Sequence, residues 1–201
     1  MAAKFFISWD GLSFLLSPTW APLPVSSDVA EAVGYGAISG HEWFEEKWAI
    51  AQQSLSIAYM YKKRFPLVVA ALLLGHRWAT TWVEFRLDNM VVVSLLRSGT
   101  SKDPNMMVLL RYLSPVAACN SFAFPASYTP RWDNAIVDAL TCFDFQCFHH
   151  LAPHAAHIAT PILPSLSAQL PVIRLESAKV TWLMALPLQL IKSMAQLNTS
   201  S

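Results

Sequence analysis

The stretch Trp82-Val83-Glu84-Phe85-Arg86-Leu87-Asp88 alternates apolar and polar residues and ends on a carboxylate. Its apolar residues would share one face of an extended chain, because successive side chains of a β-strand point to opposite faces. The pattern predicts a strand that carries Asp88 at its end. Asn89 follows directly and is a residue type that favours the N-cap of a helix.

Upstream of this strand, three short runs predict three antiparallel strands. The first, Val25-Ser26-Ser27-Asp28, follows a Pro-rich stretch and ends on a second carboxylate. Gly34-Tyr35-Gly36-Ala37-Ile38 comes at hairpin distance from it, and the aromatic-rich run from His41 to Trp48 supplies the third strand.

The remaining elements alternate between helices and strands. Apolar residues at helical spacing predict a helix over 62–78 that begins close to Lys62, because Pro66 is tolerated only in a first turn. Further downstream we expect helices over Met90–Leu96 and Pro104–Ala118, a strand over Phe122–Tyr128, and a short helix over Asn134–Leu140 that carries Asp138. The predicted order is three strands, helix, strand, two helices, strand and helix.

The composition favours one folded domain. Of 201 residues, 54% are hydrophobic and only 13% are charged, which argues against disorder over most of the length. We expect an N-terminal extension over 1–19, a domain over 20–148, and a Pro-rich linker and poorly ordered tail over 149–201.

The charge and the cysteines restrict the partners and the compartment. A formal net charge of +1 provides no global basic field, so any affinity for nucleic acid must be local or supplied by an attached domain. Three cysteines without an evident disulfide framework fit a reducing compartment, and no apolar run reaches the length of a membrane span. We therefore expect a cytoplasmic or nuclear protein; the sequence does not indicate its oligomeric state.

Three aspartates fall where a hydrolytic metal site would need them. Asp28 and Asp88 lie at strand or turn positions, and Asp138 lies on a late helix. Enzymes that hydrolyse phosphodiesters with two metal ions hold them through carboxylates, and the expected ion is Mg²⁺ or Mn²⁺. The pattern alone is only moderately specific, because an aspartate at a strand end is as often a turn or cap residue.

An ordered series of motifs makes the interpretation more specific. Over about residues 20–155 the chain resembles the RNase H domain of DIRS-type retrotransposon reverse transcriptases, through motifs such as Ser27-Asp28, Gly34-Tyr35-Gly36-Ala37, His41-Glu42-Trp43-Phe44, Phe65-Pro66, Gly75-His76-Arg77-Trp78, Leu87-Asp88-Asn89 and Asn134-Ala135-Ile136-Val137-Asp138. The resemblance implies an α/β fold with an RNase H-like mixed sheet, in which three antiparallel strands are followed by parallel strands, flanked by helices.

The resemblance also implies an activity and shows a defect in it. Domains of that family are endonucleases, hydrolases that degrade the RNA strand of an RNA–DNA hybrid while tethered to a reverse transcriptase, and they use four acids. Three acids fall on Asp28, Asp88 and Asp138, but the fourth, a glutamate, falls on Lys63. A lysine removes one ligand and adds a like charge beside divalent ions, so we expect a degenerate copy of a transposable element with strongly reduced or absent cleavage.

Several residues allow a functional and a plainer interpretation. Asn89, Ser101 and Asn134 are candidates for contacting the hybrid backbone, or are simply helix caps. The cluster Lys62-Lys63-Arg64 could contact phosphate, but a cluster of this size is more often a solvated helix end. The alternative for the whole chain is a vestigial or domesticated domain that interacts with nucleic acid or protein without catalysis.

We expect tryptophans at sheet and helix positions to belong mainly to the core, although they could instead stack on bases; these are Trp43, Trp48, Trp78 and Trp82.

Overall fold

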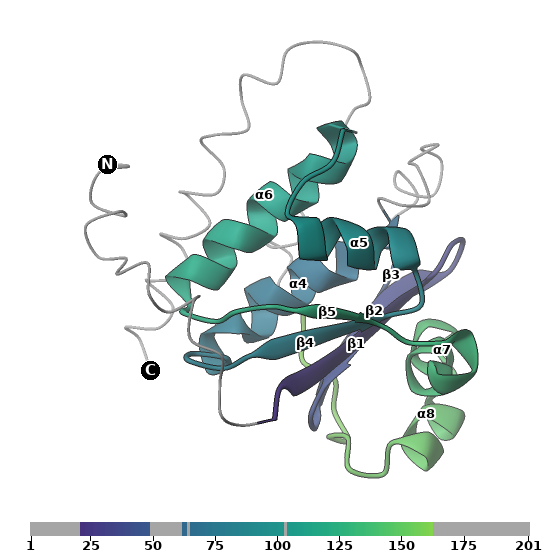
Figure 1. Ribbon diagram of the computed structural model, residues 1–201. Helices are drawn as coiled ribbons and strands as arrows, with labels where there is room; N and C mark the ends of the chain where they lie inside the picture. The colour runs from purple at the N-terminus through teal and green to yellow at the C-terminus, as the bar shows by residue number, and fades with distance from the viewer. Residues whose placement is uncertain (1–20, 49–61, 64, 103, 163–201) are drawn as a thin grey trace.

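A five-stranded mixed sheet forms the centre of the molecule (Figure 1). The computed structural model describes residues 21–48, 62–63, 65–102 and 104–162. The strands lie in the order β3-β2-β1-β4-β5, with β1, β2 and β3 antiparallel and β4 and β5 parallel to β1. The predicted mixed sheet, antiparallel strands first and parallel strands after them, is confirmed. The bounds are β1 (Leu23–Ala30), β2 (Gly34–Ser39), β3 (Glu42–Lys47), β4 (Val83–Leu87) and β5 (Ala126–Tyr128).

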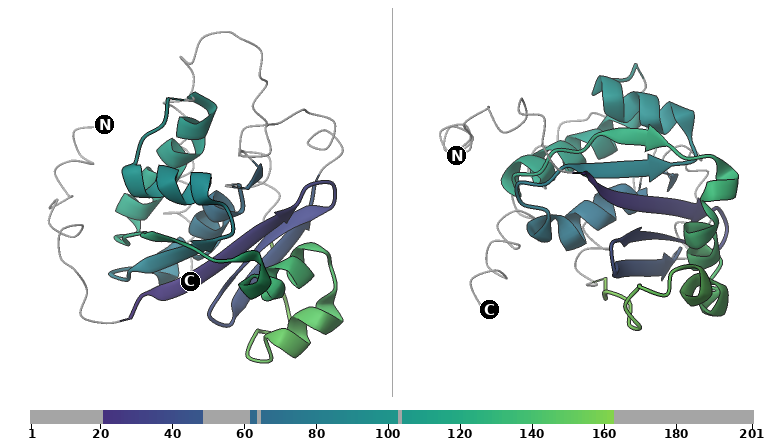
Figure 2. Two further views of the ribbon diagram at one scale, coloured as in Figure 1. Left: turned by 45° about the vertical axis from the view of Figure 1, so that its right-hand side comes forward. Right: turned by 60° about the horizontal axis from the view of Figure 1, so that its bottom comes forward.

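Helices cover both faces of this sheet. Side chains alternate across each strand, so Ala37 and its neighbour Ile38 belong to two different apolar clusters. The first cluster includes residues of α4 (Phe65–Leu74), α5 (Met90–Ser98) and α6 (Pro104–Cys119), and the second includes residues of α7 (Ala135–Thr141) and α8 (Phe145–Leu151). Figure 2 shows α7 and α8 grouped apart from the other three helices. Two short 3₁₀ turns, η1 (Gly75–Arg77) and η2 (Arg131–Asp133), complete the described elements.

The first cluster is the main core and is built around α4. This helix has apolar residues on all sides, and every residue except Leu73 is buried, as expected for a helix enclosed by other elements. Tyr35 of β2 packs its ring against Trp48 and Phe65 at centroid distances of 4.6 and 5.0 Å. The expectation that Trp43, Trp48 and Trp78 are core residues is confirmed, since each is at most 4% exposed.

The second cluster extends the packed domain beyond the predicted end at residue 148. Trp43 donates its indole N–H to the carbonyl of Ala156 at 2.6 Å, and the backbone N–H of Ala156 donates to His41 at 2.7 Å. Thr160 adds a backbone hydrogen bond to Trp43 at 2.8 Å. The prediction of a linker is therefore wrong for 149–162, because the edge strand β3 and this segment satisfy each other's backbone groups. The predicted extension over 1–19 and the tail from 163 onward lie outside the described residues.

Several element boundaries differ from the predictions. Strand β1 continues past Asp28 to Ala30, because Val29 and Ala30 still pair with β2 before the hairpin turn. Helix α4 begins at Phe65, three residues later than expected. Strand β5 is shorter than the predicted Phe122–Tyr128, since it begins at Ala126, after Pro125, which lacks a backbone N–H.

Among the described helices, none combines the length and the apolar character that crossing a bilayer requires.

Candidate functional site at the carboxyl end of the parallel strands

Parallel strands bring their carboxyl ends to the same edge of a sheet, and here β1, β4 and β5 do so. Asp28 lies two residues before the end of β1, and Asp88 directly follows β4. Helix α7 packs against β1 and β2 and places Asp138 in hydrogen-bond contact with Asp28. Two predicted site residues from distant parts of the chain, Asp28 and Asp138, thus meet directly.

Lys63 links Asp28 to the third aspartate. Its Nζ donates a hydrogen bond to Oδ1 of Asp28, and it lies 3.1 Å from each carboxylate oxygen of Asp88. The Lys63 side chain is 6% exposed, and the side chains of Asp28 and Asp88 are 8% and 19% exposed. The three predicted aspartates and the predicted lost position therefore form one cluster, with the ammonium group between two carboxylates.

Burial and hydrogen bonds set the protonation of this cluster. Burial and a hydrogen bond with Asp138 raise the pKa of Asp28 to about 6, although the Lys63 ammonium acts in the opposite direction. Burial alone would lower the pKa of Lys63, but the carboxylates of Asp28 and Asp88 raise it above its ordinary value. At neutral pH Lys63 is therefore a cation, and Asp28 is mostly an anion.

This arrangement does not fit the predicted Mg²⁺ or Mn²⁺ pair. Divalent ions need several free carboxylate oxygens, but Oδ1 of Asp28 and both carboxylate oxygens of Asp88 accept hydrogen bonds from the Lys63 ammonium. A cation in that position repels a metal ion as well as occupying its ligands. Across the part of the chain that the structure describes, no group of three or more His, Cys, Asp or Glu side chains is placed to hold a metal.

Lys62, the residue before Lys63, is also buried, at 5% exposure. Its Nζ donates to the backbone carbonyl of Glu31 at 2.9 Å and lies 5.5 Å from the ring centroid of Trp48. The prediction that the basic cluster is a solvated helix end is therefore wrong for both lysines. Sequence patterns missed this because their partners come from the β1–β2 turn, the end of β3 and the aspartates, all remote in sequence.

The three candidate contacts to nucleic acid have different surroundings. Asn89 caps α5, with its Oδ1 accepting from the backbone N–H groups of Val91 and Val92 at 3.0 and 3.2 Å, so the cap interpretation is confirmed there. Asn134 is 2% exposed, makes no side-chain cap bond, and leaves its amide Nδ2 without a partner. The cap interpretation is therefore wrong for the Asn134 side chain.

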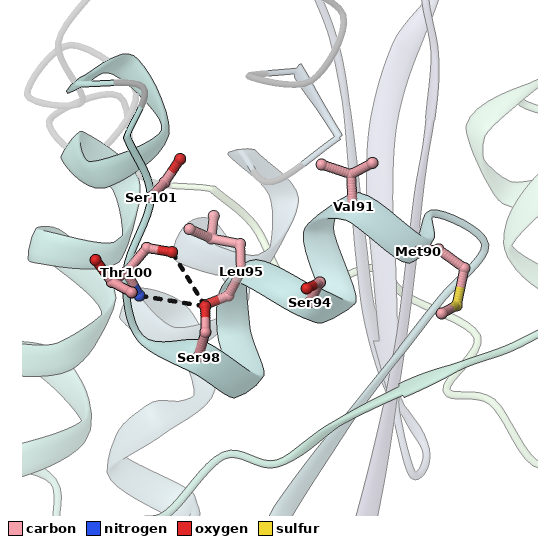
Figure 3. A pocket seen from close by; sticks show the side chains of 7 residues that line it. All are labelled: Met90, Val91, Ser94, Leu95, Ser98, Thr100 and Ser101. Carbon is pink, nitrogen blue, oxygen red and sulfur yellow. Dashed lines mark hydrogen bonds between the residues drawn. The ribbon is translucent and has the colours of Figure 1, made fainter.

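Ser101 lies beyond the end of α5 that is remote from Asp88. It borders a hollow of about 470 Å³ whose other lining residues are Met90, Val91, Ser94, Leu95, Ser98 and Thr100 (Figure 3). Its backbone N–H is 3.1 Å from the sulfur of Met107. The nine residues of α5 span about 13 Å, so this hollow extends away from the aspartates along the helix.

One exposed turn beside the aspartates was missed by sequence reasoning. Trp132, in η2, is 80% exposed, and its neighbour Arg131 is exposed as well. The available signal was a Pro-Arg-Trp-Asp turn between a strand and a helix. The stretch lies between the expected strand over Phe122–Tyr128 and the expected helix over Asn134–Leu140, and its tryptophan was not singled out among the eight of the chain.

The strand order, the mixed pairing and the helices on both faces define an RNase H-like fold. No family model and no curated protein matches the chain. Among solved structures it is similar to RNase H1 from the halophilic archaeon Halobacterium salinarum NRC-1, with a TM-score of 0.47 and 14% identity over 62% of this chain and 99% of that one. It is also similar to the N-terminal RNase H domain of rv2228c from Mycobacterium tuberculosis, with a TM-score of 0.44 and 18% identity over 65% and 99% of the two chains.

Proposed function

We propose that this chain is an RNase H-type domain that binds RNA–DNA hybrids and lacks metal-dependent cleavage. The position of the Lys63 ammonium, between the carboxylates of Asp28 and Asp88, is the observation that carries the proposal. The RNase H-like fold and the ordered sequence motifs support the hybrid as ligand, and the lysine argues against hydrolysis.

The chemistry of the site explains why binding and cleavage separate. Hydrolysis of a phosphodiester needs an activated water and stabilised charge on the leaving oxygen, which divalent ions supply in two-metal sites. The Lys63 ammonium is a single charge that is already engaged by oxygens of Asp28 and Asp88. Recognition of a hybrid depends instead on groove shape, 2′-hydroxyls and phosphates, and it does not require this cluster to hold a metal.

The motif series further suggests the origin and setting of the domain. We propose descent from a DIRS-type retrotransposon, in which the domain was tethered to a reverse transcriptase that supplied much of the affinity for the hybrid. In this proposal the protein acts in the cytoplasm or nucleus. The net charge of +1 fits weak binding by the isolated domain.

A cleavage assay with binding measured separately tests the proposal. Binding of a labelled RNA–DNA hybrid is measured in EDTA, and cleavage is measured in Mg²⁺ and in Mn²⁺. We expect the wild-type chain to bind the hybrid and to leave it intact. Lys63→Glu should bind Mg²⁺ in a calorimetric titration and gain cleavage, since it replaces the blocking cation with a fourth carboxylate.

Two matched variants separate charge from ligation. Lys63→Gln removes the positive charge without adding a carboxylate, so it should bind metal more weakly than Lys63→Glu. Lys63→Glu combined with Asp88→Asn should lose both metal binding and the gained cleavage. Equal, robust cleavage by the wild type and Lys63→Glu would contradict the claim of lost hydrolysis, whereas failure of the wild type to bind hybrid would contradict the nucleic-acid ligand.

A further inference from the structure

The turn after β5 presents an aromatic and cationic surface next to the aspartate cluster. We define this surface as Tyr128, which is 45% exposed, together with Arg131 and Trp132. Trp132 is 80% exposed, whereas the core tryptophans Trp43 and Trp48 are each 4% exposed. A tryptophan this exposed leaves a large apolar area in water, which favours a role in contacting a ligand.

The backbone holds this surface in a fixed place. Within η2, the N–H of Asp133 donates to the carbonyl of Pro130 at 2.9 Å, and the N–H of Asn134 donates to that of Arg131 at 3.1 Å. Asn134 is buried and directly precedes α7, so the turn is attached directly to a packed helix. The indole of Trp132 is therefore displayed from a short, hydrogen-bonded turn.

The surface is continuous with the proposed nucleic-acid site. Tyr128 pairs in register with Leu87, the residue before Asp88, and the N–H of Thr129 donates to the carbonyl of Leu87 at 2.8 Å. The turn then leads into α7, which carries Asp138. A strand of nucleic acid lying over the aspartate cluster would therefore pass close to Trp132.

The charge of the turn fits a nucleotide. Arg131 makes no ion pair with any other residue in the described ranges, so its guanidinium is available to a phosphate. Asp133 is also exposed on this turn and forms no ion pair with Arg131. An aromatic face beside an arginine combines base stacking with phosphate binding, as in proteins that bind single strands.

We infer that Trp132 stacks on an unpaired base of the bound nucleic acid while Arg131 contacts its phosphate. The inference rests on the proposed function and adds a preferred substrate class: a hybrid with an adjoining single strand. Bases inside a duplex are stacked on both faces, whereas an unpaired base in an adjoining single strand can offer its face to the indole.

The test compares hybrids that differ only beside the duplex. Binding by the full chain is measured in EDTA by fluorescence anisotropy, with a blunt RNA–DNA hybrid, the same hybrid with a single-stranded overhang, and the same overhang made of abasic sites. We expect the wild type to bind the base-containing overhang more tightly than the other two. Trp132→Ala should weaken that binding about tenfold, which is within the range for loss of one stacked base, and Trp132→Phe should retain part of it.

A second exposed apolar residue, far from the turn, provides the control. Ile158→Ala removes an apolar side chain that is 83% exposed in the segment beside β3, at the opposite edge of the sheet from β5, and it should leave all affinities unchanged. If Trp132→Ala binds the overhang as the wild type does, or weakens blunt and overhang hybrids equally, stacking on an unpaired base is wrong and the proposed function stands. If the wild-type chain binds none of the three hybrids, the proposed function fails and this inference fails with it.

Discussion

Lys62 and Lys63 are neighbours in the chain and almost equally buried, but they lie in opposite electrostatic settings. Lys62 is held by neutral groups, the carbonyl of Glu31 and the ring of Trp48. Lys63 is held by two carboxylates, those of Asp28 and Asp88. Burial alone therefore does not define the role of a lysine. The charge of its partners decides whether its removal leaves a neutral group or unpaired carboxylates in the interior.

The difference matters because buried charges are costly without a partner. Removing Lys62 leaves a carbonyl oxygen that has lost one hydrogen-bond donor, which is a modest loss. Removing Lys63 leaves two carboxylates facing each other in a largely dry site, and such unpaired charges are strongly destabilising. The first lysine behaves as an anchor for the β1–β2 turn, and the second is the counter-charge of the whole site.

The largest effect should follow from Lys63→Met. Loss of the counter-charge should lower the free energy of unfolding by about 3–5 kcal/mol at pH 7. Urea denaturation of the wild type and the variant measures this difference. The loss should shrink at about pH 5, because the raised pKa of Asp28 lets it take up a proton and relieve the repulsion. A loss below about 1 kcal/mol at pH 7 would show that the Lys63 ion pairs are not the counter-charge of the site.

The pH dependence of stability should show the Asp28 carboxyl directly. The pKa of Asp28 is raised from its ordinary value of 3.8 to about 6 in the folded protein, so between these pH values the folded state keeps a proton that the unfolded chain has released. Unfolding therefore releases a proton between these pH values, and stability should fall as the pH rises from about 4 to about 6.

The size of this slope can be isolated with one variant. A shift of about two pKa units corresponds to at most about 3 kcal/mol across the interval. Denaturation series at several pH values should show the slope in the wild type and in Lys62→Met, and its loss in Asp28→Asn. If Asp28→Asn keeps the whole slope, another group is responsible.

Lys62→Met should have a smaller effect than its neighbour. The variant keeps an apolar side chain near Trp48 and loses the bond to the Glu31 carbonyl, which should cost about 1–2 kcal/mol. The cost should be the same at pH 5 and pH 7, since no carboxylate is left unpaired. Equal losses for Lys62→Met and Lys63→Met at pH 7 would remove the distinction between anchor and counter-charge.

The same contrast shows what the sequence could and could not predict. Local patterns predicted the strand that leads to Asp88, the cap at Asn89 and the order of the elements as far as α7, because alternation and capping depend on neighbouring residues; they did not predict α8. They also nominated Asp28 and Asp138, which do meet. The burial of Lys62 and the packing of 149–162 depend on groups that only the folded chain brings together.

The exposed indole of Trp132 was missed for a related reason. Each of the eight tryptophans is expected to be buried, because the chain is apolar. Trp132 is exposed because its turn lies outside both apolar clusters, which the sequence does not reveal. The hydrogen bonds of Lys63 likewise could not be predicted from the presence of a lysine where the resemblance implies a glutamate, since a lysine at that position could have turned toward solvent.

The smallest expected effect on stability should come from Asn89, which caps α5 directly after Asp88. Asn89 caps α5 through two backbone N–H groups, so Asn89→Ala should lower the free energy of unfolding by about 1 kcal/mol, while Asn89→Ser should keep most of the cap. Because the cap fixes the chain directly after Asp88, the double variant Asn89→Ala, Lys63→Met should lose less free energy of unfolding than the sum of the two single losses. A double-mutant cycle measures this coupling free energy between the two positions. Full additivity would mean that the cap stabilises α5 alone and that Lys63 itself determines the position of Asp88.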